Sequence, residues 1–196
     1  GQSGFDALGN HVGDATAIPA NFYEFINTQS QGFTIDSGNA ARGLNAYTDA
    51  LNLLANQDEF DINLILLPGV INSIHSAVAS KAIDVCESRG DCFTVIDPVI
   101  YGKNVTDATT ESEGKDSNFA AMYWPWVKVP DSQVAGTQRW VPPSTVIGGI
   151  YAFNDRVAHP WFAPAGLNRG GITTAIQAER KLTQGNRDDL YDSNIN

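Results

Sequence analysis

The sequence predicts an α/β domain in which a mostly parallel sheet is flanked by helices in a three-layer-like arrangement. Two short, continuous apolar runs, at 61–67 and 92–96, are typical of strands buried on both faces. A stretch with helical spacing of apolar residues precedes each run, and the links between them are short. Helix, strand, helix, strand in this order indicates a parallel sheet with a right-handed crossover.

The first helix is expected over 40–56, where four apolar residues recur at helical spacing: Leu44, Tyr47, Leu51 and Leu54. The strand at 61–67 follows, and the turn-forming pair Pro68-Gly69 is expected to end it.

A second helix is expected over 71–88, with Gly90 as its C-terminal stop. The strand at 92–96 comes next, and Asp97-Pro98 is expected to end it. Residues 104–116 are polar and predict either a helix or a loop.

Residues 119–129 are rich in aromatic and β-branched residues and predict a third strand, which Pro125 would restrict to an edge or a bulge. Pro142-Pro143-Ser144 is expected to open a helix over 145–154. A short strand at 174–181 and a short helix at 186–193 complete the prediction.

The chain divides into two parts by composition. Residues 1–38 are rich in Gly, Asn, Ser and Thr, and we interpret them as a loop-rich segment at the edge of a preceding or inserted domain. Residues 39–196 carry the α/β pattern and form the core domain, which we expect to be incomplete at its C-terminus.

The net charge of −10 argues against nucleic-acid binding and against docking on an anionic membrane surface, because both need a basic footprint. Four cations nevertheless gather near the C-terminus: Arg169, Arg180, Lys181 and Arg187. They predict either docking on an acidic protein partner or charge pairing within the domain, with Glu179, Asp188 and Asp189 as candidate partners.

The two cysteines, Cys86 and Cys92, are expected to be buried or half-buried free thiols. The longest apolar run, 62–67, is far shorter than the roughly 20 residues of a membrane span.

A search for catalytic motifs finds no phosphate-binding loop, no dinucleotide fingerprint, no nucleophile elbow and no spaced set of metal ligands. The best enzyme hypothesis uses Asp97 at the carboxyl end of a strand, with Asp155 and His159 as partners if the fold brings them near. The competing interpretation makes Asp97 part of a strand-ending turn and Asp155 a helix cap or ion pair. We favour it, and expect a protein without enzymatic activity, metal or cofactor.

Six aromatic residues are candidates for a sugar- or base-stacking platform, although core packing or a subunit contact is the favoured interpretation. They are Tyr123, Trp124, Trp126, Trp140, Trp161 and Phe162.

Three segments resemble the sequence pattern of contractile phage tail sheath proteins, most closely those of the T-even type. The run at 140–152, W-V-P-P-S-T-V-I-G-G-I-Y-A, is followed by Asn154-Asp155; the run at 161–166 reads W-F-A-P-A-G within a longer A-G-L-N-R-G at 165–170; and 190–196 reads L-Y-D-S-N-I-N. All three occur in the family's order and at plausible spacing.

The resemblance implies a structural subunit that polymerises in six-fold rings around a tail tube and contracts to drive the tube through the host envelope. It implies contacts with further copies of the chain, the tube protein, and baseplate and tail terminator proteins. It also implies a place in the virion after assembly in the host cytoplasm. The sheath of a phage-derived injection machine, a tailocin, is the alternative from the same architecture.

The resemblance also assigns expected roles to residues. Pro142, Pro143 and Ser144 should start a helix, and Gly148 and Gly149 should let this helix pack closely on the sheet. Asp155, Pro164 and Asn196 complete the signature. The 163–170 loop and the four C-terminal cations are expected to face the tube or an adjacent subunit.

Overall fold

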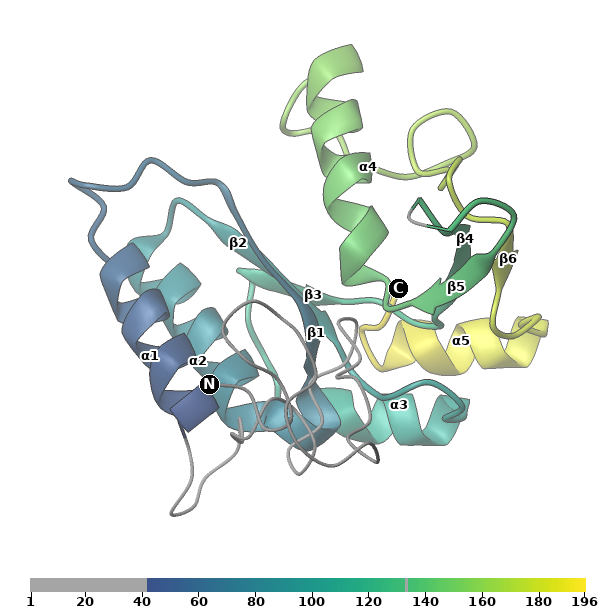
Figure 1. Cartoon of the computed structure of the whole chain (residues 1–196), viewed down its shortest axis with the longest axis horizontal. Helices are drawn as coiled ribbons and strands as arrows, with labels where there is room; N and C mark the ends of the chain where they lie inside the picture. Colours follow the sequence, from purple (N-terminus) through teal and green to yellow (C-terminus); the bar gives the residue numbers. More distant parts are fainter. Residues whose placement is uncertain (1–41, 133) are drawn as a thin grey trace.

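Two small sheets organise residues 42–132 and 134–196, which are the residues described by the computed structural model (Figure 1). Residues 1–38, interpreted above as a loop-rich segment, lie outside this range. The elements, in chain order, are α1 (Arg42–Leu54), β1 (Leu64–Ile71), α2 (Asn72–Arg89), β2 (Phe93–Asp97), α3 (Val105–Ser112), β3 (Ala120–Met122), β4 (Val127–Pro130), β5 (Gln138–Val141), α4 (Ser144–Val157), β6 (Gln177–Ala178) and α5 (Gln184–Asp192).

The first sheet is parallel, in the order β1-β2-β3, and its strands follow the predicted alternation with helices. Neighbouring residues of β1 point to opposite faces. Ile65 packs into a core with residues of α1 and α2, whereas Leu66 faces Gly148 of α4. Helices therefore cover both faces (Figure 1), and the predicted three-layer α/β fold is confirmed.

The predicted end of the first strand is wrong. β1 continues through Pro68 and Gly69 to Ile71, with an irregular register against β2 between Leu66 and Ile71. Gly69 has a φ of 89°, which glycine adopts without steric cost, and Pro68 lies on an edge strand, where it removes no ladder hydrogen bond. A bulge therefore accommodates a pair that sequence alone identifies as a turn.

The predicted third strand, 119–129, is divided between two sheets. β3 pairs with β2 in the parallel sheet, whereas β4 pairs with β5 and β6 in an antiparallel sheet of order β5-β4-β6. The sequence pattern did not predict β5, and the expected strand at 174–181 shortens to β6. Along the chain, β4 and β5 of this second sheet connect the parallel sheet to the start of α4.

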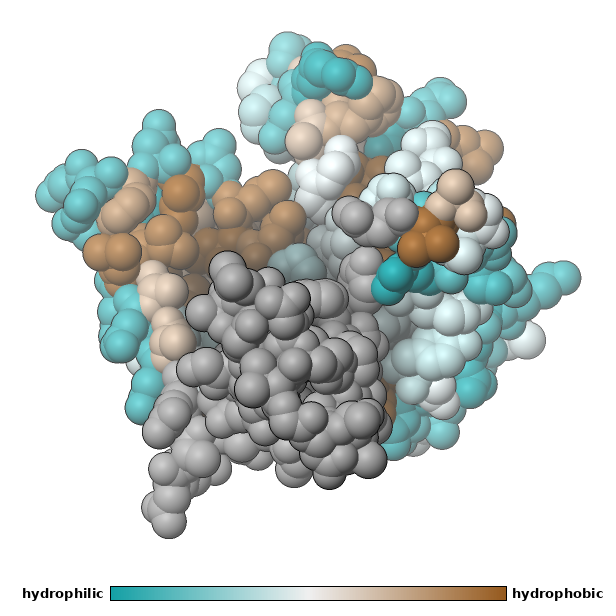
Figure 2. Space-filling view, viewed as in Figure 1, coloured by the Kyte–Doolittle hydropathy of each residue, from teal (hydrophilic) through white to brown (hydrophobic). Residues whose placement is uncertain are grey.

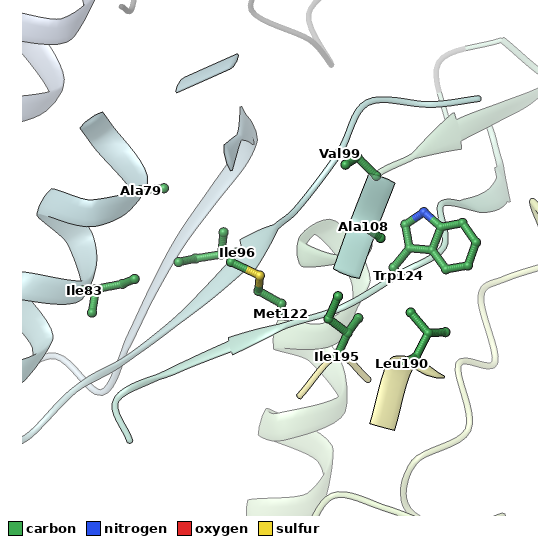
Figure 3. Packing of buried hydrophobic residues seen from close by; sticks show 9 residues of the cluster. All are labelled: Ala79, Ile83, Ile96, Val99, Ala108, Met122, Trp124, Leu190 and Ile195. Atoms are coloured by element: carbon green, nitrogen blue, oxygen red, sulfur yellow. The ribbon is translucent and has the colours of Figure 1, made fainter. Parts of the chain in front are cut away.

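Two clusters of buried side chains pack on the α2 side of the sheet. One joins α1, α2 and β1 through Leu51, Val78 and Ile65. The other joins α2, β2, β3, α3 and α5, and also includes Ile195 beyond α5 (Figure 3).

The two cysteines are free and buried, as predicted, with their Sγ atoms 3.3 Å apart. Burial raises the pKa of the Cys86 thiol. Across the described residues, no helix has the length and apolar character needed to cross a bilayer.

Candidate functional site

The segment that carries the signature begins where β5 ends and α4 starts. Pro142 and Pro143 follow Val141, the last residue of β5, and both are buried. Pro143 has helical backbone angles, with a φ of −54°, and Ser144 is the first residue of α4. A proline suits this position because the first amides of a helix have no intrahelical partner. The expected helix start is confirmed.

Ser144 is tied to the parallel sheet through Asp97, the last residue of β2. The Ser144 amide donates to Oδ1 of Asp97 at 2.9 Å, and its hydroxyl donates to Oδ2 at 2.5 Å. Asp97 is 1% exposed, and burial raises its pKa to about 7, while the hydrogen bonds from Ser144 act in the opposite direction. A carboxylate at a helix N-terminus satisfies an otherwise unpaired amide. Asp97 therefore joins β2 to α4.

The structure does not bring together the three residues of the enzyme hypothesis. Asp97 lies at the N-terminal end of α4, whereas Asp155 is near its C-terminal end and exposed to solvent. Asp155 lies eleven positions after Ser144 in the helix, which corresponds to about 16 Å along the axis. His159 lies beyond the helix and stacks on Trp161. The condition of the enzyme hypothesis, that the fold bring Asp155 and His159 near Asp97, is therefore not met.

The two glycines of α4 differ in their surroundings. A Cβ on Gly148 would collide with Cδ1 of Leu66 in β1. Because glycine has no side chain, the helix can lie close to the sheet at this position. Gly149 is exposed, and a Cβ there would meet no atom within 4 Å. The expected close packing is thus confirmed at Gly148 and wrong at Gly149.

Beyond α4, the chain folds back on the C-terminal end of the helix. Asn154 is buried, and its Nδ2 donates to the carbonyl oxygen of Phe162 at 2.8 Å. Pro164 lies in the turn that follows, where a Cβ on Gly170 would come within 3.0 Å of the Pro164 carbonyl oxygen. The 161–170 segment is therefore held against α4 by specific contacts.

The six aromatic residues do not form one platform. Trp124 and Trp126 are buried, and the Trp126 indole donates to the carbonyl of Val99. Trp161, by contrast, is 77% exposed. Some of these residues fill the interior and others lie on the surface.

The four basic residues lie on different parts of the surface. The guanidinium of Arg169 lies 4.9 Å from the ring centre of Phe162, and Arg187 donates to Gln184 within α5. Arg180 and Lys181 line a shallow depression beside the start of α3. The ion pairs formed within residues 42–132 and 134–196 are Arg89–Asp91 and Arg139–Asp131. The predicted pairing of these cations with Glu179, Asp188 and Asp189 is therefore absent from the described part of the chain.

The third signature segment completes the core. Leu190 and Ile195 are both buried in the second cluster (Figure 3). Ile195 forms a parallel bridge with Met122 of β3, and the Asn196 backbone exchanges hydrogen bonds with Met122 and Trp124. This segment therefore extends the parallel sheet beyond β3.

Sequence reasoning missed the contact between Asp97 and Ser144 and the bridge from Ile195 to Met122. The first had a weak signal, since an acid that ends a buried strand is a natural partner for a helix N-terminus. The second had no signal, because two residues cannot be recognised as a strand.

No cluster of three or more His, Cys, Asp or Glu side chains suited to a metal ion occurs among the described residues. The hollows on their surface are open depressions, such as the groove between Phe93 of β2 and Tyr151 of α4. The contacts of the signature segments connect α4 and the C-terminal segment to the sheet.

Comparison with known proteins identifies the same region. Residues 43–196 match the family model described as the phage tail sheath protein central domain. The chain is 27% identical to the tail sheath protein of Enterobacteria phage T4 over 219 aligned positions, covering 95% of this chain and 32% of that protein. It is also 27% identical to the tail sheath protein of Vibrio phage KVP40 over 202 positions, covering 86% of this chain and 29% of that protein. The chain thus spans about a third of the length of these relatives.

Proposed function

Because this chain belongs to the family of phage tail sheath proteins, we propose that it is part of a sheath subunit that polymerises in six-fold rings around a tail tube and contracts. The observation that carries this proposal is the match of the central-domain model to residues 43–196, which includes all eleven helices and strands of the described chain except the first residue of α1. The role is structural, with no reaction catalysed and no cofactor required.

In this proposal, the subunits assemble in an extended, metastable state around the tube. A signal from the baseplate converts them to a shorter, wider and more stable state, and the tube is driven through the host envelope. The free energy resides in the contacts between subunits. Packed interfaces switch between discrete arrangements, so a modest difference per subunit becomes large over many rings.

The parallel sheet offers a means of linking neighbours. β1 is an edge strand, and across the described residues its outer side has no partner strand. An exposed edge presents unpaired amides and carbonyls that another chain's strand can satisfy. We place a terminal arm of an adjacent subunit on this edge.

The partners of this subunit are further copies of itself, the tube protein, and the baseplate and tail terminator proteins. Its location is the virion tail, after assembly in the host cytoplasm. The four basic residues, Arg169, Arg180, Lys181 and Arg187, face the tube or an adjacent subunit. A tailocin sheath is the second candidate, because it uses the same architecture.

Negative-stain microscopy of the sheath subunit at its full natural length, expressed with its tube protein, tests the proposal. We expect striated tubes of stacked rings. Monomers that never form rings would contradict it, and turnover of a substrate that Asp97→Asn abolishes would support an enzyme instead.

The role of the basic residues has its own test. Reversing the charges of Arg180 and Lys181 to Glu should weaken co-assembly with the tube or with neighbouring subunits. Intact co-assembly after reversal of all four cations would remove the docking proposal and leave the structural role unchanged.

A further inference from the structure

The C-terminal end of α4 and the 161–170 segment form an exposed cluster in which arginine guanidinium groups lie over aromatic rings. The Arg156 guanidinium lies 5.5 Å from the ring centre of Phe153, and that of Arg169 lies 4.9 Å from the ring centre of Phe162. Trp161 stacks on His159 beside them. We call Phe153, Arg156, Trp161, Phe162 and Arg169 the aromatic–arginine knob.

The knob is exposed although its residues are of the kind that proteins bury. Phe153, Trp161 and Phe162 are all large exposed hydrophobic residues, and Leu167 in the adjoining turn is fully exposed. In Figure 2 apolar and charged side chains lie side by side over α4, whose far end extends beyond the sheet in Figure 1. Clustered aromatic residues and arginines at a surface mark protein contacts, because these side chains dominate the energetics of interface centres.

The knob is held in one shape before any contact forms. The Asn154 side chain fixes the Phe162 carbonyl, and the Gly170 amide donates to the Gly166 carbonyl at 2.8 Å. A Cβ on Gly170 would come within 2.9 Å of backbone, so the turn closes tightly there. Preordered side chains lose little conformational entropy on binding, which favours association.

The charge of the knob indicates the chemistry of its partner. The knob carries Arg156 and Arg169, and the acids nearby are Asp155, the chain neighbour of Arg156, and Asp91, which lines the same groove as Phe162. The knob is thus a locally cationic surface on an acidic protein. Electrostatic complementarity favours an acidic, rigid partner.

The same chain carries such a surface in the connection between α1 and β1. Asp58, Glu59 and Asp61 are exposed there, and none is in an ion pair within the described ranges. We call these three residues the acidic turn. Asn63, at the end of the same connection, and Phe162 of the knob line one groove, so the turn and the knob of one copy flank this groove.

Arg89 holds the acidic turn in place. Its buried guanidinium donates to the carbonyl oxygens of Leu54 and Phe60, and its charge is matched by Asp91 at 2.7 Å. The backbone on either side of the three acids is therefore fixed.

We infer that the aromatic–arginine knob of one copy docks on the acidic turn of a second copy. The two surfaces differ, so the contact between copies is heterologous, and repeating it builds a ring or an open helix. The inference rests on the proposed sheath function and names one of the surfaces that the assembly uses.

Photo-crosslinking in assembled sheaths tests this contact directly. Leu167 is replaced by p-benzoylphenylalanine in the full-length subunit, and tagged and untagged copies are mixed before irradiation. We expect an intermolecular crosslink to a peptide that contains residues 55–63. Crosslinks to another part of the subunit or to the tube protein, or normal sheaths without any crosslink, would overturn the inference.

Charge reversal supplies an independent test. Arg156→Glu with Arg169→Glu should raise the critical concentration for assembly about tenfold, because like charges then face each other. Adding Asp58→Lys and Glu59→Lys to the same chain should restore assembly. The control is Lys81→Glu with Lys103→Glu, which makes the same change in net charge away from both surfaces.

The outcomes separate this contact from the proposed function. Failure of the unaltered subunit to form rings would count against the sheath function itself. Rings that form normally with the reversed knob, or a reversed knob that the reversed turn does not rescue, would overturn the docking inference alone. Circular dichroism of each variant identifies any that fails to fold, and the photo-crosslinking result then decides.

Discussion

Asp97 and Ser144 lie 47 residues apart in the chain, and the Asp97 carboxylate accepts two hydrogen bonds from Ser144, at 2.9 and 2.5 Å. One residue ends a strand of the parallel sheet, and the other begins α4. Both are buried. The pair thereby attaches the helix that carries the sheath signature to the sheet beneath it.

Ser144→Ala should destabilise the domain. The substitution removes the hydroxyl donor and leaves a buried carboxylate oxygen without that partner, which costs about 1–3 kcal/mol in the free energy of unfolding. Urea denaturation measures the change. Thr145→Ala, one residue further and exposed, is the matched control and should have little effect. Equal stability of both variants would show that the pair contributes little.

Asp97 should make stability depend on pH in an unusual direction. Burial raises the pKa of this carboxyl from 3.8 to about 7, so between these values the folded state holds a proton that the unfolded state has released. The stabilising contribution is complete below pH 3.8 and is lost as the pH rises through about 7. Asp97→Asn should remove this part of the pH dependence in denaturation curves measured across the window. A wild-type slope retained in that variant would assign the effect to another group.

The two glycines of α4 should respond differently to the same substitution. Gly148→Leu places a side chain against Leu66 and should cost about 1–3 kcal/mol of stability through overpacking. Gly149→Leu extends into open space and should be neutral or stabilising by up to about 1 kcal/mol, since glycine is a poor helix former. Thermal unfolding of both variants provides the comparison. A fully folded Gly148→Leu of native stability would remove the close-packing explanation.

The segment after α5 should behave as part of the folded core. Leu190→Ala should cost about 2–5 kcal/mol, because it opens a cavity in the second cluster. Tyr191→Ala is the adjacent control, since Tyr191 is 81% exposed and its loss should change stability little. Denaturant midpoints of the two variants test the difference. Similar small effects would indicate that 190–196 docks only weakly.

Most of the helices could be predicted from the helical spacing of their apolar residues, and the strands β1 and β2 from short continuous apolar runs. The helix start at Ser144 followed from the two prolines before it. Division of 119–129 between two sheets could not be predicted, since β3 and β4 follow each other closely in one stretch rich in strand-forming residues. Which sheet a strand joins depends on partners far away in the chain.

The sequence by itself determined the α/β order, the absence of recognisable catalytic motifs and the resemblance to sheath proteins, because these depend on local period and on linear motifs. Only the tertiary structure decided that Asp97 binds Ser144, that Gly148 rather than Gly149 faces the sheet, and that Trp161 lies on the surface. It also placed Ile195 beside Met122, which extends the sheet. The physical reason is that spacing defines which face of an element is apolar, whereas the neighbour against which that face packs is selected by contacts between distant parts of the chain.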